Sequence, residues 1–272
     1  MKKRILKISA FFLALALIAG VCGFANGLVG NPISKMMAQR TAQAYLETIY
    51  ADTDYSIETI SYNFKDGNYY VHLTSPSSMD GDFTLSISML GELTYDDYAS
   101  RVIHHGNTAN RLYFEYREMV DSVLKSHAFP YTVSIGYGDL VFDREYGEEA
   151  IDGALLQSDL INDKFYNVGE LGATNGTLVL YIDSDMLSNE KAAEILLKTK
   201  ELMNGAGVSF YSIHLVLQYP PYEAEEDYIR PKGEIDIRSF LCSDIYEEDL
   251  VSRVIDAIQD TKNYYKEQNK LK

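Results

Sequence analysis

The sequence predicts an α+β protein in which an N-terminal transmembrane helix precedes two small domains of helices packed on short antiparallel sheets. An uncharged apolar segment over residues 8–30 predicts the membrane helix. Beyond it, each half of the chain mixes helical patterns with short strands and tight turns, which is typical of antiparallel sheets. The expected divisions are 1–30 for the cytoplasmic tail and anchor, 31–129 for the N-terminal domain and 130–272 for the C-terminal domain.

The apolar segment is long enough to cross a bilayer, whose hydrocarbon core of about 30 Å needs roughly 20 helical residues. Four cations precede it, namely Lys2, Lys3, Arg4 and Lys7. Because positively charged flanks stay in the cytoplasm, this order predicts a single-pass protein of the cell membrane with its C-terminal bulk extracytoplasmic. Residues 8–30 would then contact the lipid bilayer.

Two other interpretations of this segment remain open. Gly23-Phe24-Ala25 places small residues where a signal peptidase acts, so the alternative is a cleaved and secreted protein. The apolar run continues past that site through Leu28 and Val29, which favours an uncleaved anchor. Cys22 would be acylated in a lipoprotein, although Val21 stands where a smaller residue is expected.

The N-terminal domain is predicted to combine one helix with a three-stranded antiparallel sheet. The helix spans residues 33–50 and follows the membrane helix after a kink at Gly30 to Pro32, because proline is tolerated at a helix start. An Asp-Gly pair in residues 65–68 indicates a hairpin turn. Strands are expected over residues 55–64, 69–74 and 83–89.

A long helix over residues 95–126 is expected to end this domain. Its apolar residues recur at intervals of four, and His104 to Asn107 break the pattern near its middle. Phe129-Pro130 terminates the helix, since a residue before proline is disfavoured in the α region. The domain boundary is therefore placed there.

The C-terminal domain is predicted to contain further strands and two long helices. The apolar run over residues 177–182 indicates a central strand, and Ser188 can cap a helix over 189–204. Glu223 to Asp227 are expected to form an acidic loop. A last helix opens at Asp244 or Tyr246 and is followed by a polar, fraying tail from Lys262 to Lys272. The remaining strands are expected over residues 131–137, 210–217 and 234–241.

The chain is strongly acidic, with a formal net charge of −16. Residues 8–272 hold 20 Lys and Arg against 40 Asp and Glu, a formal charge of −20. Such a surface repels nucleic acid, so no nucleic-acid partner is expected. The two cysteines, Cys22 and Cys242, should lie on opposite sides of the membrane boundary, so no intrachain disulfide is expected.

No metal site is predicted. His104 and His105 are adjacent, so on a helix they point about 100° apart and cannot share an ion as residues four apart would. Asp183-Ser184-Asp185 with Glu194 matches part of a calcium loop, but Ser188 stands where that loop needs glycine. A strand-to-helix loop with a helix cap explains these residues better.

No catalytic residue and no cofactor-binding site is predicted either. Gly136-Tyr137-Gly138 lacks the third glycine of a dinucleotide fingerprint. No Gly-x-Ser-x-Gly motif is present to expose a nucleophilic serine. Cys242 ends an apolar strand and is expected to be a buried structural cysteine.

The candidate interaction patch is an acidic stretch flanked by tyrosines. Tyrosine offers a large rigid contact surface and a hydroxyl group, while the negative charge attracts cationic partners. The expected partner is a basic protein or a basic peptide, and a merely solvated loop is the alternative. The patch consists of Tyr219, Tyr222, Glu223, Glu225, Glu226, Asp227 and Tyr228.

Three segments resemble the YfjL-like family of uncharacterised membrane-anchored bacterial proteins. They are the lysine-rich start with its apolar span, Asn31-Pro32-Ile33-Ser34-Lys35 leading to Tyr45-Leu46, and Ser243-Asp244-Ile245-Tyr246-Glu247-Glu248. The first half also resembles small peptidase-propeptide domains, in which a helix precedes three antiparallel strands. The resemblance implies an N-terminal and a C-terminal domain at a bacterial surface, and it supplies no reaction and no site residues.

These observations favour a non-catalytic extracytoplasmic module that binds a protein or peptide. A hydrolase whose site is assembled from distant residues is one alternative, and a structural accessory of a membrane complex is another. A cleft with converging titratable groups would favour an enzyme. An exposed apolar patch or an open sheet edge would favour a binding module.

Overall fold

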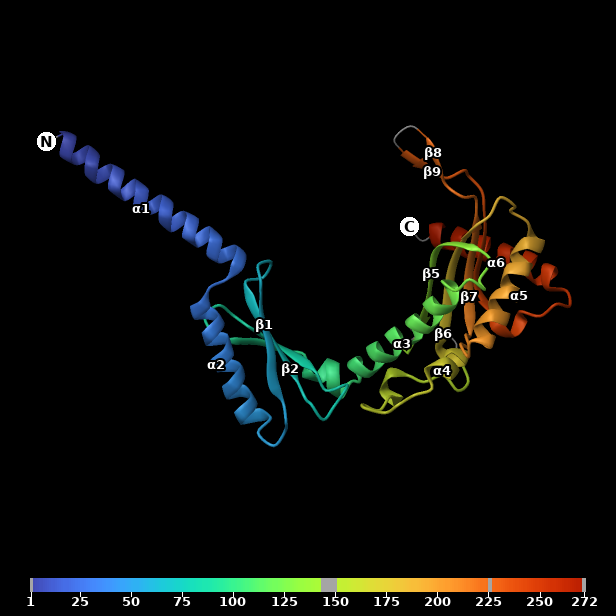
Figure 1. Cartoon of the computed structure of the whole chain (residues 1–272), viewed down its shortest axis with the longest axis horizontal. Helices are drawn as coiled ribbons and strands as arrows, with labels where there is room; N and C mark the ends of the chain where they lie inside the picture. The colour runs from blue at the N-terminus through green and yellow to red at the C-terminus, as the bar shows by residue number, and fades with distance from the viewer. Residues whose placement is uncertain (1, 143–150, 225–226, 271–272) are drawn as a thin grey trace. The chain divides into compact units, whose positions relative to one another are not determined.

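The computed structural model describes residues 2–142, 151–224 and 227–270; some side chains near the N-terminus, that of Cys22 and those of residues 223–229 lie outside this description. The chain forms two compact units. Unit 1 comprises Met1–Thr108 and Ile161–Asp163, and unit 2 comprises Ala109–Leu160 and Lys164–Lys272. The predicted α+β class is confirmed: a long apolar N-terminal helix precedes two four-stranded sheets with helices packed against them (Figure 1).

Unit 1 begins with helix α1 (Lys2–Val29), which belongs to a segment long and apolar enough to cross a membrane. A signal sequence near the N-terminus has the same properties. The helix ends at Gly30, whose φ of +69° is in the left-handed region. Helix α2 (Pro32–Ile49) then starts, and the Asn31 side chain caps it by accepting a 2.8 Å hydrogen bond from the Ser34 N–H. The predicted kink between the two helices is present.

Tyr69 holds the junction between the two helices. Its hydroxyl accepts a 2.7 Å hydrogen bond from the Asn31 N–H and donates one of 2.9 Å to the Asn31 carbonyl. A Cβ atom on Gly30 would lie 2.5 Å from the same hydroxyl oxygen. Only glycine therefore satisfies both the backbone conformation and the close approach of the tyrosine.

The unit 1 sheet is wholly antiparallel and has the order β1-β2-β3-β4. Its strands are β1 (Ser56–Asn63), β2 (Asn68–Thr74), β3 (Phe83–Ile87) and β4 (Leu93–Asp96). Alternate residues of β2 and β3 are buried on the face that α2 covers, because side chains of a strand point to opposite sides in turn. Ala38 and Ala42 of α2 are fully buried there, and their small side chains let the helix approach the sheet closely.

The predicted single helix over residues 95–126 is wrong at its N-terminal end. Tyr95 and Asp96 belong to β4, a π-helical turn η1 (Ala99–Ile103) follows, and helix α3 (Gly106–Leu124) starts only after His105. The hydrogen bonds between β4 and β3 explain the difference, because they stabilise an extended conformation that local helical periodicity does not reveal. The four-stranded sheet likewise replaces the three strands expected.

The segment Ile161–Asp163 belongs to unit 1 although its sequence neighbours belong to unit 2. The Asp163 carboxylate accepts hydrogen bonds from the Met79 N–H at 2.7 Å and the Asp80 N–H at 3.0 Å. In return, the Asp163 N–H donates to the fully buried carboxylate of Asp80 at 2.8 Å, which the Thr108 hydroxyl also reaches at 2.9 Å. These reciprocal bonds satisfy buried polar groups and fix the segment in place.

The unit 2 sheet is mixed rather than wholly antiparallel, with the order β10-β7-β6-β5. Strand β6 (Gly176–Asp183) lies parallel to β7 (Ser212–Gln218), and helix α5 (Asn189–Gly205) connects them. Parallel neighbours need such a crossover, whereas the outer strands β5 (Thr132–Leu140) and β10 (Glu234–Leu241) pair antiparallel. A second, two-stranded sheet is formed by β8 (Tyr222–Ala224) and β9 (Asp227–Ile229).

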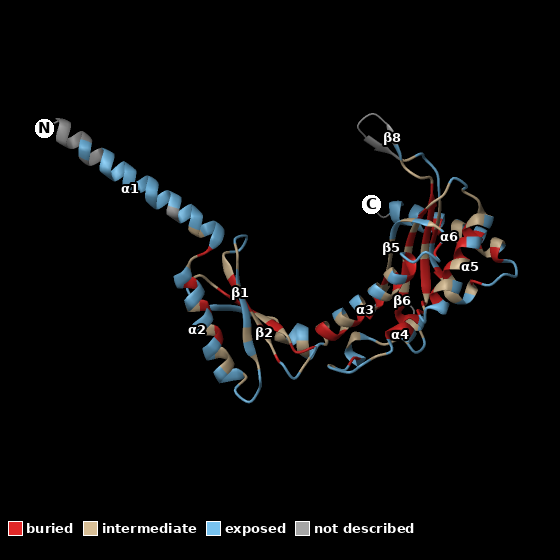
Figure 2. Ribbon diagram, in the orientation of Figure 1, coloured by how far each residue is buried: buried red, intermediate tan, exposed pale blue. Residues whose placement is uncertain are grey.

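One hydrophobic core spans unit 2 (Figure 2). Helix α3 contributes Leu112, Tyr116 and Val120, all fully buried, so this helix belongs to unit 2 for nearly its whole length. The compact units divide between Thr108 and Ala109, within the first turn of the helix, whereas the sequence placed the domain boundary at Phe129-Pro130, after the helix. The remaining elements are η2 (Gln157–Asp159), α4 (Val168–Asn175), η3 (Cys242–Asp244) and α6 (Leu250–Lys270).

The last helix differs from the sequence-based expectation at both ends. It begins at Leu250, after the short turn η3, and it continues through residues 262–270, where a fraying tail was expected. Thr261 explains part of this extension, because its hydroxyl accepts a 3.0 Å hydrogen bond from the Arg238 N–H on the outer strand β10. Tyr264 stacks beneath the Arg238 guanidinium, 4.2 Å from ring centroid to Cζ.

Candidate binding groove

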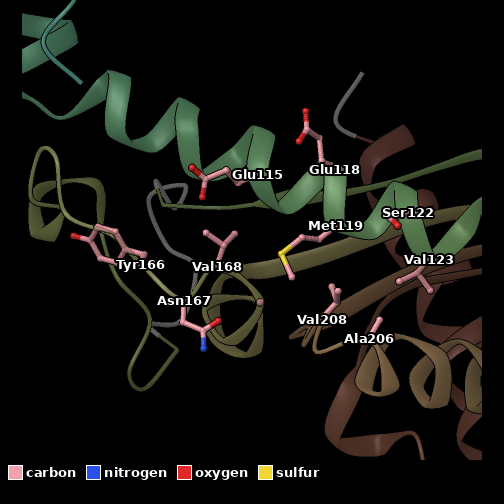
Figure 3. Close-up of a pocket in the computed structure, with 11 residues that line it drawn as sticks. Glu115, Glu118, Met119, Ser122, Val123, Tyr166, Asn167, Val168, Ala206 and Val208 are labelled. Atoms are coloured by element: carbon pink, nitrogen blue, oxygen red, sulfur yellow. The ribbon is translucent and has the colours of Figure 1, made fainter. Parts of the chain in front are cut away.

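A groove of about 620 Å³ lies in unit 2, and we refer to it as the α3–α4 groove (Figure 3). Met119 projects from α3 toward Val168 of α4 and Val208 of the segment before β7. Val168 and Val208 are buried, so the floor of the groove is apolar. The complete lining is Glu115, Glu118, Met119, Ser122, Val123, Tyr166, Asn167, Val168, Gly169, Ala206 and Val208.

The helical repeat of α3 places the first wall. Tyr116, Val120 and Leu124 recur at intervals of four and face the core, which leaves Glu115 and Met119 on the neighbouring side. Glu115 and Glu118 lie at the border of the groove. Glu115 is half-buried, and Glu118 is exposed. The groove therefore combines an apolar floor with an acidic border.

A close backbone contact places the second wall. The Asn167 side chain caps α4, and Gly169 lets the helix approach the segment before β7. The Ser209 N–H donates a 2.9 Å hydrogen bond to the Gly169 carbonyl. A Cβ atom on Gly169 would lie only 2.1 Å from the Gly207 carbonyl oxygen, so a larger residue would push the wall away.

The charged groups of the groove are mostly carboxylates. Arg111 lies 3.3 Å from Glu115 and also donates a 3.0 Å hydrogen bond to the Lys164 carbonyl, which ties α3 to the loop beside α4. Lys164 in turn lies over the ring of Tyr166, 4.7 Å from its centroid. No histidine, cysteine or lysine lines the groove in the described residues. The described lining thus places an apolar floor beside two carboxylates, of which Glu115 is paired with Arg111.

The residues of the predicted interaction patch lie around the β8–β9 hairpin. Tyr219 is half-buried and its carbonyl accepts a 2.6 Å hydrogen bond from Arg230, whereas Tyr222 is exposed at the start of β8. Glu223 and Tyr228 are opposite each other in the hairpin, so the acidic loop expected over 223–227 is partly strand. Cross-strand pairing overrides the low strand propensity of these acidic residues.

The other residues of this patch lie wholly or partly outside the described part of the chain. Glu225 and Glu226 lie outside the described residues, and so do the side chains of Glu223, Asp227 and Tyr228. Of the patch residues whose side chains are described, neither Tyr219 nor Tyr222 lines the α3–α4 groove. The patch as a whole stays a prediction from sequence.

Two other polar arrangements lie in unit 2, around His214 and around Asp183. His214 Nε2 lies 2.8 Å from Asp236 Oδ1, and Asp236 is the only side chain recorded in a hydrogen bond with this histidine among the described residues. Asp183, from the calcium-like stretch, instead pairs with Arg230 and accepts a hydrogen bond from Gln218. No cluster of three or more His, Cys, Asp or Glu side chains suited to a metal ion occurs in the described part of the chain.

Cys242 is half-buried at the start of η3. Burial raises the pKa of its thiol, while nearby Lys200 partly offsets this effect. A thiol with a raised pKa is a poor nucleophile at neutral pH, because the thiolate is the reactive form. The direction of this shift therefore leaves little thiolate on Cys242 at neutral pH.

Comparison with known protein families covers both units. Residues 2–97 match the YfjL-like N-terminal domain, and residues 115–255 match the YfjL-like C-terminal domain. The chain belongs to the YfjL-like family. Neither the curated proteins nor the solved structures gave a match. All residues that line the α3–α4 groove fall within the YfjL-like C-terminal domain.

Sequence reasoning did not identify the groove of this YfjL-like chain. The first wall could be recognised from local sequence, since Glu115, Met119 and Ser122 follow helical spacing. They lie beside the row of buried residues on α3. The second wall comes from residues 166–169 and 206–208, which are distant in the sequence from α3 and from each other. No pattern within a single element contains that information.

Proposed function

We propose that this YfjL-like chain is a membrane-anchored extracytoplasmic module that binds a protein or peptide without catalysing a reaction. The α3–α4 groove is proposed to hold an apolar side chain of the partner with a basic residue beside it. The observation that carries the proposal is the combination of an apolar floor, made by Met119, Val168 and Val208, with the carboxylates of Glu115 and Glu118 at its border.

The proposed location rests on α1 and its flanking charges. The helix has the length and composition of a membrane span, and Lys2, Lys3, Arg4 and Lys7 lie at its N-terminal end. The positive-inside rule then leaves both units outside the cytoplasm. The tie between Tyr69 and Asn31 would keep unit 1 directly at the end of the anchor.

Binding is preferred over catalysis because of the chemistry of the groove. An enzyme site brings together a nucleophile, a base and groups that stabilise developing charge. The described lining offers carboxylates, a serine and a tyrosine, and no histidine to activate the serine. An apolar cavity with a few polar groups at its border is instead typical of sites that recognise a side chain.

The net charge of −16 supports a cationic partner. Long-range attraction would speed the encounter, and it would weaken as salt screens charges over about 8–10 Å. Burial of one leucine side chain contributes about 1.5–3 kcal/mol, so the apolar floor would add at least about tenfold in affinity beyond charge alone. A partner that offers both features should therefore bind better than one that offers either alone.

Three end-blocked synthetic peptides of equal length test the proposal. The first contains leucine and lysine, the second contains leucine and glutamate, and the third contains serine and lysine. They are titrated against the full chain in phosphatidylcholine nanodiscs by fluorescence anisotropy. The leucine–lysine peptide should bind at least about tenfold more tightly than the other two. Met119→Ser should remove most of that preference, and Glu115→Gln with Glu118→Gln should weaken binding and flatten its dependence on salt.

The matched control is Glu247→Gln with Glu248→Gln, which makes the same charge change at exposed residues outside the groove. It should leave the affinity within about twofold of the unmodified chain.

Substituting Glu223, Glu225, Glu226 and Asp227 by their amides tests the hairpin patch in the same assay. If that variant weakens binding while the groove variants do not, the patch is the site and the groove assignment is wrong. Equal binding of all three peptides would contradict both.

A further inference from the structure

Strand β1 is an outer strand of the unit 1 sheet and is eight residues long. It pairs with β2 on one side, so its other side has no strand partner in the described part of the chain. Long uncovered edges are uncommon in natural sheets, because their free N–H and C=O groups readily bind other chains. In unit 2, by contrast, Thr261 of α6 accepts a hydrogen bond from the edge residue Arg238. The other outer strand of unit 1, β4, has only four residues.

A groove of about 560 Å³ follows this edge, and we refer to it as the α2–β1 groove. One side is Ser56 to Ile60 of β1, and the other is a row of α2 residues. Lys35, Gln39 and Gln43 stand four residues apart in that row, so they follow one face of the helix. Leu46 closes the row, and Ile57 and Ile60 are half-buried against the unit 1 core. An extended chain placed there would meet backbone partners and the side chains of Ile57 and Ile60 on the β1 side. On the α2 side it would meet Leu46 and three polar side chains.

The positive charge of the α2 row lies at one end of the α2–β1 groove. Helix α2 ends at Ile49 and β1 starts at Ser56, so the helix and the strand run in opposite directions. Leu46 consequently lies toward the Ser56 end of the groove, and Lys35 lies toward the Ile60 end. Lys35 is exposed and forms no ion pair with the described residues, whereas Gln39 and Gln43 are neutral. The other charged residue of the lining, Glu58 of β1, lies 3.4 Å from His72 Nε2 on β2. A carboxylate would find its complement only at the Lys35 end of the α2 row.

A bulge between Ile57 and Thr59 bends β1 inside the groove. Bulges of this kind redirect side chains and occur often beside functional sites. The bend keeps the edge from being flat, which disfavours indiscriminate pairing with any passing strand. The bulge therefore restricts pairing on β1 to a short segment whose shape only some strands fit.

We propose that the α2–β1 groove binds an extended peptide segment as an additional antiparallel strand on β1. Apolar side chains at alternate positions of the segment face Leu46, Ile57 and Ile60. Because an antiparallel segment starts beside the Ile60 end, a carboxylate near its N-terminus faces Lys35. Backbone hydrogen bonds supply affinity, and the alternate side chains and the carboxylate supply selectivity. This site is independent of the α3–α4 groove and prefers the opposite charge.

Two end-blocked peptides that alternate valine and threonine test this inference, one with glutamate and one with lysine at the N-terminal position. Each is added to the full chain in phosphatidylcholine nanodiscs, and backbone amide exchange is followed by mass spectrometry. The glutamate peptide should slow exchange in residues 56–60 and bind about fivefold more tightly than the lysine peptide. Lys35→Glu should reverse the preference, whereas Lys65→Glu, an exposed lysine in the β1–β2 turn, should preserve it.

Exchange at the buried β2 amides in the Lys35→Glu variant checks that unit 1 remains folded. The inference is overturned if neither peptide binds, or if a peptide binds without slowing exchange in residues 56–60. It is also overturned if Lys35→Glu, while folded, leaves the preference unchanged. Protection of residues 56–60 without peptide, in a sample that sediments as a dimer, would show that a second copy occupies the edge instead.

Discussion

The hydroxyl of Tyr116 donates a 2.8 Å hydrogen bond to the backbone carbonyl of Ser209 inside unit 2. Three glycines make room for the ring: Cβ atoms built on Gly138, Gly172 and Gly176 would lie 2.8, 2.7 and 2.5 Å from Tyr116 atoms. Burial raises the pKa of this tyrosine, so its hydroxyl stays protonated and remains a donor. The contact joins α3 to the segment that precedes β7, and the same two elements form walls of the α3–α4 groove.

Tyr116→Phe should destabilise unit 2 by about 1–2 kcal/mol, because the Ser209 carbonyl loses a hydrogen-bond donor while the ring still fills its space. The measurement is urea unfolding of the detergent-solubilised full chain, followed by circular dichroism. An unchanged free energy of unfolding would mean that water replaces the hydroxyl at no cost. The variant should also lower the affinity for the leucine–lysine peptide, since the groove wall is less firmly held.

Gly172→Ala should destabilise unit 2 by about 3 kcal/mol or more. A Cβ atom at this position would lie 1.9 Å from the Ser209 carbonyl oxygen, and backbone cannot move away as the end of a flexible side chain can. Gly205→Ala is the matched control, since its Cβ atom would meet nothing within 4 Å at the end of α5. The control should stay within about 1 kcal/mol of the unmodified chain. Equal effects of the two substitutions would contradict the packing argument.

Unit 1 should lose stability at alkaline pH through Tyr45. The Tyr45 hydroxyl donates a 2.6 Å hydrogen bond to Asp96, and this bond, together with burial and the Asp96 charge, raises the tyrosine pKa to about 12 from 10.0. Because the folded pKa is raised, the contribution is fully present below pH 10 and is lost as pH rises from about 10 to about 12.

Tyr45→Phe tests this pH dependence. At neutral pH the variant should have a lower free energy of unfolding than the unmodified chain, because it lacks the bond to Asp96. The difference should shrink as pH rises through the alkaline window, since the unmodified tyrosine ionises there. Tyr95→Phe removes a hydroxyl from a side chain that is 60% exposed and serves as the control for the substitution itself. A difference that is constant across the window would refute the assignment to Tyr45.

The full chain should retain residues 1–30 in the membrane, and protease added outside spheroplasts should degrade residues 31–272. The reason is the apolar length of α1 and the cations before it. Mass spectrometry of the purified protein separates the alternatives: a chain that starts at Asn26 indicates a cleaved signal, and a lipid on Cys22 indicates a lipoprotein. Degradation only after lysis would reverse the topology.

Local signals predicted individual elements with considerable accuracy. Ser188 was expected to cap a helix, and its hydroxyl accepts a 3.2 Å hydrogen bond from the Lys191 N–H at the start of α5. The strand expected over residues 234–241 is β10 with the same bounds. Each of these features depends on residues within a few positions of one another, so a pattern along the chain contains them.

The sequence-based prediction was wrong for strands whose conformation depends on pairing with another segment. Tyr95 and Asp96 continue a helical pattern in sequence, but their pairing with β3 makes them strand. Glu223 and Asp227 have the composition of a loop, yet they belong to paired strands. In both cases the hydrogen bonds that decide the conformation come from another segment, and single-residue propensity is too weak to oppose them.

The sequence by itself determined the apolar N-terminal span, the acidic charge, the alternation of helices and strands, and the family. These properties are sums or periodicities along the chain, and they require no knowledge of which segments meet. Tertiary structure alone decided that β6 and β7 are parallel neighbours, that Tyr116 fits among three glycines, and that α3, α4 and the segment before β7 enclose a groove. The physical reason is that packing brings together residues far apart in sequence, and the shape and charge of a binding site arise only from that meeting.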